Sequence, residues 1–139
     1  MNSIFTRNDG LFRGLHFGIP MDSISIFEGK KPTFKDRCGQ VYESRPDSGM
    51  NLRLEYFNHC PPAEGDTILK GILVTLELNE ETDAVELLGE MERKIRQSEG
   101  IPEGAFGNWE WMQRGTPTGI QLKLSPDRKQ ISLNYFEGS

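Results

Sequence analysis

The nitrogen and sulfur side chains suited to metal binding are few in this sequence of 139 residues: His16, His59, Cys38 and Cys60. No two of them have the Cys-x-x-Cys or His-x-x-x-His spacing that brings two zinc ligands together. His59 and Cys60 are neighbours whose side chains project differently, and no third residue marks an orienting group for a Cys–His nucleophile. We therefore expect no metal site, no cofactor and no catalytic residues.

One alternative leaves room for chemistry. Cys38 is distant in sequence from His59 and Cys60, so it could join them only through the tertiary fold. A pocket near these three residues would make the chain a small-molecule-binding or enzymatic α+β domain. The discriminating observation would be a bound metal or an unusually reactive thiol.

The N-terminal residues and the two cysteines predict a cytoplasmic protein. Residues 1–9 lack the apolar stretch of a signal peptide. In a chain without an export signal, Cys38 and Cys60 are expected to be reduced thiols. The most apolar run, residues 68–78, is interrupted by Lys70 and Glu77 and is shorter than the roughly 18 apolar residues of a membrane span. No membrane contact is expected.

The charge of the chain is concentrated in one segment. Sixteen basic and 21 acidic residues give a formal net charge of -5, which excludes a nucleic-acid surface built on bulk positive charge. Residues 77–103 hold nine acids and three bases, a net of -6. A solvated helix explains this excess, and the alternative is a surface, centred on Glu86 and Glu90, that steers a basic protein partner.

Two segments have the marks of helices. Residues 20–28 begin at Pro20 and end before Gly29, which predicts about two turns. Residues 80–98 end before Gly100 and place five apolar side chains on one stripe: Ala84, Leu87, Leu88, Met91 and Ile95. The second helix is expected to pack on a flat surface.

The strands follow from alternation with a period of two. Residues 40–44 and 50–58 form a predicted hairpin, because Leu52, Leu54 and Tyr56 alternate with Arg53, Glu55 and Phe57. Residues 11–17 read as a weak strand or arm, and 68–78 as the longest strand. Three further strands are expected at residues 108–113, 119–125 and 130–136.

These elements predict an α+β fold, with two helices packed on one face of an antiparallel sheet of about six strands. We expect a single domain, 1–139, in two halves of about residues 11–78 and 79–139, each a helix followed by three strands. The halves share a Glu-Gly helix end, at Glu28 and Glu99, and Leu54-Glu55-Tyr56-Phe57 is echoed by Leu133-Asn134-Tyr135-Phe136. No sequence repeat is established by this echo.

Two features bear on partner binding. Trp109 and Trp111 share one side of their strand, and we expect both in the core; if displayed, they would be hot-spot candidates. With helices on one face of the sheet, the other would expose a mixed polar surface suited to a protein partner: Arg53, Glu55, Glu110, Gln121, Lys123 and Asn134. An ordinary solvated sheet face would have the same pattern.

The segment that begins Phe12-Arg13-Gly14 and continues through Phe17-Gly18-Ile19-Pro20 to Phe27-Glu28-Gly29 resembles the opening of small bacterial proteins with the beta-lactamase-inhibitory-protein-like arrangement. In that family a helix-backed antiparallel sheet grips a partner protein without catalytic residues. The family's inhibitors are exported and carry disulfides, two features not expected here. The resemblance therefore implies an intracellular immunity protein or inhibitor that neutralises a toxin or enzyme, with a basic toxin as one partner.

Overall fold

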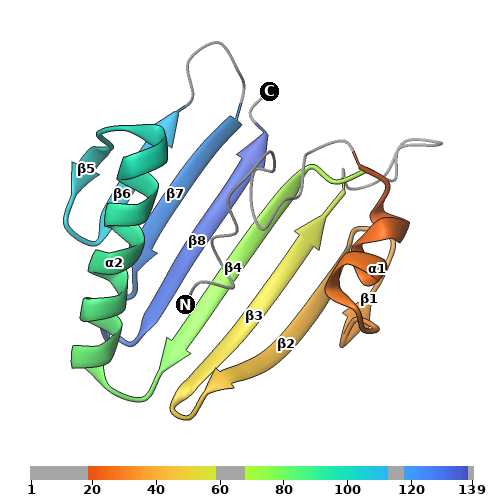
Figure 1. Cartoon of the computed structure of the whole chain (residues 1–139), viewed down its shortest axis with the longest axis horizontal. Coiled ribbons are helices and arrows are strands. Elements are labelled where there is room, and N and C mark those ends of the chain that lie inside the picture. The colour runs from red at the N-terminus through yellow and green to blue at the C-terminus, as the bar shows by residue number, and fades with distance from the viewer. Residues whose placement is uncertain (1–18, 59–67, 113–117, 138–139) are drawn as a thin grey trace.

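The described part of the chain forms one antiparallel sheet of eight strands in the order β1-β2-β3-β4-β8-β7-β6-β5 (Figure 1). The structure is a computed structural model that describes residues 19–58, 68–112 and 118–137. The strands are β1 (Phe34–Lys35), β2 (Gly39–Asp47), β3 (Met50–Phe57), β4 (Gly71–Leu78), β5 (Glu103–Ala105), β6 (Asn108–Met112), β7 (Thr118–Leu124) and β8 (Gln130–Glu137). Strands β4 and β8 thus lie at the centre, and β1 and β5 at the edges.

Both α-helices lie on the same face of this sheet, near its opposite edges (Figure 1). A 3₁₀ turn, η1 (Met21–Ser23), leads into α1 (Ile24–Glu28), and the longer α2 (Glu81–Glu99) connects β4 to β5. Gly29 ends α1 with φ of 72° and Gly100 follows α2 with φ of 91°. Both values lie in the region that glycine adopts without steric cost.

The core lies between the helices and the sheet. Alternate residues of each long strand point to it, which follows from the two-residue period of a strand. The strands contribute mainly Leu52, Leu54, Tyr56, Ile72, Val74, Leu76, Ile120, Leu122, Ile131, Leu133 and Tyr135, and the helices Ile24, Ala84, Leu88, Met91 and Ile95. The apolar stripe predicted for residues 80–98 is therefore the buried face of α2.

The predicted sheet of about six strands is wrong, because the sheet has eight. Each helix is followed by four strands instead of the three predicted for each half, and α1 is only five residues long. The two missed strands, β1 and β5, are the edge strands, two and three residues long and exposed throughout. They carry no apolar alternation, and their pairing with β2 and β6 alone makes them strands.

Other predicted elements agree with the structure to within a few residues. The hairpin of β2 and β3 is present, α2 covers the segment predicted at 80–98, and β8 the segment at 130–136. Strand β4 begins at Gly71, three residues later than predicted, while Ile68 forms an isolated bridge with Pro20. The predicted strand or arm at residues 11–17 lies outside the described residues.

The last residue of each α-helix is a glutamate whose charge acts on buried tyrosines. The hydroxyl of Tyr56 donates a hydrogen bond to the carboxylate of Glu28, and the Tyr42 ring meets Tyr56 edge-on, with centroids 5.7 Å apart. Burial and, secondarily, the charge of Glu28 raise the pKa of Tyr42. Burial and, secondarily, the charge of Glu99 raise the pKa of Tyr135. The echo seen in the sequence therefore pairs a helix end with a tyrosine in both halves.

These tyrosines predict a loss of stability at alkaline pH. An unfolded tyrosine ionises near pH 10, whereas Tyr42 and Tyr135 hold their protons more tightly in the folded chain. The stabilising contribution is therefore full below about pH 10 and falls as pH rises above it. Urea unfolding at about pH 9 and about pH 11 should show this fall, and Tyr135→Phe should make it shallower. Phenolate formation by Tyr42 or Tyr135 near pH 10 in the folded protein would contradict their raised pKa values.

A second prediction concerns close backbone contact at Gly39. A Cβ there would lie 2.4 Å from the carbonyl oxygen of Tyr56, so the β2–β3 pairing must shift to accept alanine. We expect Gly39→Ala to lower the free energy of unfolding by about 2 kcal/mol. The matched control is Gly89→Ala in α2, where the nearest atom to a new Cβ is 3.5 Å away on Arg93; helix propensity should make it neutral or stabilising. Equal effects of the two substitutions in urea unfolding would refute this account.

Candidate functional site

The sheet face opposite the helices, here called the open face, carries six of the predicted partner-binding residues. Strand register places them in two adjacent rows that run across the strands. The first row holds Glu103, Glu110, Gln121, Asn134, Leu73 and Glu55, and it continues to Val41 and Phe34. The second holds Asn108, Lys123, Ser132, Thr75, Arg53 and Glu43. The structure therefore gathers the six residues on one continuous surface.

Four of these six side chains contact one another in pairs. Arg53 Nη2 donates to Glu55 Oε1 at 3.3 Å along strand β3. Gln121 Nε2 donates to Glu110 Oε2 at 3.2 Å between β7 and β6. A surface ion pair such as Arg53–Glu55 contributes little to folding stability. Their effect is to hold polar groups in a set orientation at the surface, where a partner can meet them.

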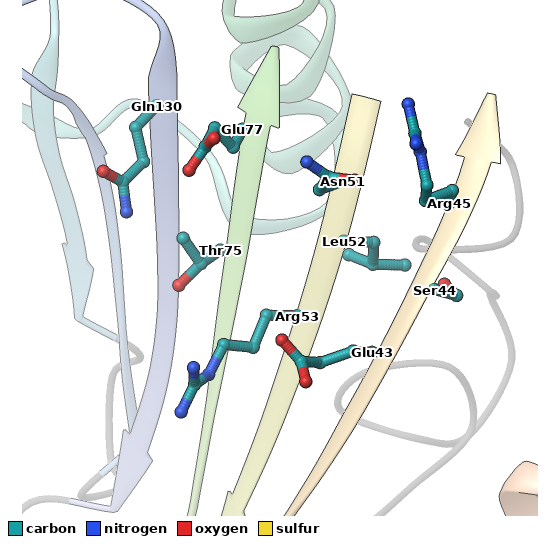
Figure 2. A pocket seen from close by; sticks show the side chains of 9 residues that line it. All are labelled: Glu43, Ser44, Arg45, Asn51, Leu52, Arg53, Thr75, Glu77 and Gln130. Atoms are coloured by element: carbon teal, nitrogen blue, oxygen red, sulfur yellow. The ribbon is translucent and has the colours of Figure 1, made fainter. Parts of the chain in front are cut away.

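A shallow depression of about 560 Å³ hollows the open face over β2, β3, β4 and β8 (Figure 2). Its lining is polar and of mixed charge: Glu43, Ser44, Arg45, Asn51, Leu52, Arg53, Thr75, Glu77 and Gln130. Figure 2 shows the Arg53 side chain extending toward Thr75 and β8, whereas the Arg45 side chain points away from Arg53. The depression is thus a gap between two rows of polar side chains, suited to hydrogen bonding.

Sequence reasoning missed most of this depression, including Arg45. The pairing of β2 with β3 shifts register between Ser44 and Asp47, so two residues of β2 face one residue of β3. Pro46 lies within this irregularity and has no N–H for the ladder. Predicting residues 45–49 as the hairpin turn left Arg45 outside any strand. The proline inside an otherwise regular strand was the available signal.

Aromatic rings and glycines form a second feature that the sequence did not single out. In the row beyond Glu55 and Asn134, strand register aligns Gly39, Phe57, Gly71, Phe136, Gly119 and Met112, here called the aromatic strip. Phe57 and Met112 are 38% and 55% exposed. A Cβ on Gly119 would lie 2.3 Å from the Phe136 ring, so this ring lies over the glycine. Phe57 shares one side of its strand with Arg53 and Glu55, and this two-residue period was the signal that it faces outward.

Glu86 and Glu90 do not join this surface. Both are exposed on α2, on the opposite side of the sheet from the other six predicted residues. On the same helix Glu92 pairs with Arg96, as an i, i+4 support predicts. One flat partner cannot cover both surfaces, so α2 and the open face are separate candidates.

The two tryptophans belong to the helix-covered side of the sheet. Trp111 is 2% exposed, and its Nε1 donates a hydrogen bond to the carbonyl oxygen of Gly100 at 2.8 Å. Trp109 is half-buried against the core, with its ring edge-on to Phe106 at 5.5 Å. The core prediction is confirmed for Trp111, and neither tryptophan is part of the open face.

The prediction of reduced thiols is wrong for Cys38, which is disulfide-bonded. The sequence has one other cysteine, Cys60, outside the described residues. Among the described residues, Cys38 lies beside the β2–β3 pairing, because Gly39 pairs with Phe57 and the Asn58 amide donates to the Cys38 carbonyl at 3.0 Å. The alternative site near Cys38, His59 and Cys60 loses its free thiol at Cys38, and His59 also lies outside the described residues.

The remaining predicted site classes can be compared with the described residues only. Within 19–58, 68–112 and 118–137, no group of three His, Cys, Asp or Glu side chains is placed to hold a metal ion. No described helix is both long and apolar enough to span a membrane. Comparison with known proteins found no matching family model, no similar curated protein and no similar solved structure.

The disulfide generates a chemical prediction. Unfolded but unreduced protein should take up no alkyl group from iodoacetamide, whereas prior reduction should expose both cysteines of the sequence. Intact-mass measurement checks the two states. Alkylation of Cys38 without reduction would contradict the bond, and a dimer that dissociates on reduction would show that it links two chains.

Proposed function

We propose that this chain is a non-catalytic protein-binding domain that neutralises a toxin or enzyme partner, as an immunity protein or inhibitor does. The observation that supports the proposal is the open face. It brings the polar side chains of two rows beside an exposed aromatic strip on one surface free of described helices. Protein interfaces likewise combine apolar, often aromatic, side chains with polar groups that form hydrogen bonds.

The open face is the better of the two candidate surfaces. Interface hot spots are enriched in aromatic and arginine side chains, and the open face has Phe57, Arg45 and Arg53. The exposed side of α2 offers Glu86 and Glu90, charges that affect the rate of encounter more than affinity. The proposal therefore assigns docking to the sheet and leaves to α2 a contribution to steering a basic partner.

The disulfide at Cys38 indicates the kind of compartment in which the domain would bind its partner. The sequence favours the cytoplasm, but cytoplasmic thiols are normally kept reduced. A disulfide-bonded Cys38 favours an oxidising compartment. The bond also removes one of the two differences from the exported inhibitors that the chain resembles. The proposed partner is accordingly one that the domain meets outside the reducing cytoplasm.

Capture of a partner by surface variants tests this proposal. Asn134 lies near the centre of the open face and is half-buried. Asn134→Arg should therefore lower partner retention from a native-cell extract about tenfold or more. The matched control, Glu86→Arg on α2, should keep most of the retention. Purified domain should also reduce the activity of the captured protein.

Three outcomes would count against it. Loss of the partner with Glu86→Arg and not with Asn134→Arg would move the interface to α2. A partner whose activity is unchanged by saturating domain would remove the inhibitory role. Turnover of a small molecule by the domain itself would replace the non-catalytic assignment. Thermal unfolding of both variants shows whether either change acts through the fold instead of the surface.

A further inference from the structure

We infer that the aromatic strip is the docking site for an arginine-bearing segment of a protein partner. This inference rests on the proposed function and adds the chemistry of the partner segment. It is carried by two independent observations on the open face: the way the aromatic rings lie on the sheet, and the separation of charge between the rows beside them.

The first observation is that the rings lie over glycines. A Cβ on Gly119 would be 2.3 Å from the Phe136 ring and 2.8 Å from the sulfur of Met112. On the other half of the strip, a Cβ on Gly39 would be 3.4 Å from the ring of Phe57. A Cβ on Gly71 would also lie 3.9 Å from the ring of Phe57. The rings therefore spread across neighbouring strands and make a low apolar platform, with Phe57 38% exposed.

The second observation is the sign of the adjacent charges. Among the described residues, the strip and the row next to it contain three carboxylates, Glu55, Glu103 and Glu110, and no lysine or arginine. Lys123 and Arg53 lie in the following row, about 7 Å further along the strands. Arg45 lies beyond them, at the depression. The apolar platform is thus bordered by negative charge.

Two of these carboxylates already have a neighbour but keep capacity for another donor. Glu55 binds Arg53 through Oε1, and Glu110 accepts from Gln121 through Oε2. An ionised carboxylate has about four lone-pair sites, and these contacts use one oxygen of each group. A cation above the strip can therefore complete the set of hydrogen bonds without displacing the existing ones.

Arginine fits this combination better than lysine or a neutral group. Its planar guanidinium stacks on an aromatic face and at the same time donates in its plane to carboxylates. Phe57 lies two residues after Glu55 on the same face of β3, and Met112 two residues after Glu110 on β6. Each carboxylate therefore stands beside an apolar member of the strip, so that a guanidinium lying on the strip has a carboxylate next to it.

A titration with two defined probes tests the inference. The probes are N-acetyl-arginine methylamide and N-acetyl-glutamate methylamide, and the readout is the NMR shifts of methyl-labelled methionines and labelled phenylalanine rings. We expect saturable shifts at Met112, Phe57 and Phe136 with the arginine probe alone. The double variant Glu55→Gln, Glu110→Gln should weaken this binding about fivefold. The matched control Glu77→Gln removes a carboxylate of the same face outside both the strip and the row next to it, and it should leave the binding unchanged.

Other results would overturn the inference. The inference fails if both probes cause equal shifts, or if the double variant and the control have equal effects on binding. It also fails if the shifts are confined to the Arg45 end of the face. The proposed function would survive such a result if a protein partner still requires Asn134. Conversely, a strip that binds the arginine probe, in a domain that retains no protein partner, would contradict the proposed function and leave the arginine site.

Discussion

The antiparallel pairing of β4 with β8 is the contact on which the rest of the molecule depends. It joins Gly71 through Glu77 to Phe136 through Gln130 in one continuous register and so turns two four-stranded meanders into a single sheet. Ile72, Val74 and Leu76 then share a face with Tyr135, Leu133 and Ile131, and all six are buried. Because successive side chains in a strand alternate, this one register also decides which residues of both strands face outward.

The same constraint gives the helices their places. Both helices must bury their apolar stripes on the only sheet face that is apolar from β2 to β6, so both lie on one side. A polar contact then holds the end of α1, where Glu28 accepts from Tyr56, and the charge of Glu99 at the end of α2 helps raise the pKa of Tyr135. A helix C-terminus disfavours a nearby carboxylate. The buried tyrosine hydroxyl offsets this at Glu28, where the hydrogen bond is seen.

On the open face the register creates the surface that the function would use. Strand ends supply Phe57, Phe136 and Met112, the next row supplies carboxylates, and the rows beyond supply Arg53 and Lys123. None of these strands has the whole pattern alone. It exists because six strands in register place equivalent positions side by side. The irregularity of β2 at residues 44–47 then opens the depression beside Arg45.

The local patterns of the sequence were enough to determine α2, the β2–β3 hairpin and the long strands. They also determined the inward direction of Leu52, Leu54 and Tyr56. All of these features follow from periodicity within one segment. The polar rows were also foreseeable as a face. The edge strands β1 and β5, the alignment of glycines with phenylalanines, and the bond at Cys38 were not. Each depends on which residue stands opposite another across strands, and only the tertiary register decides that.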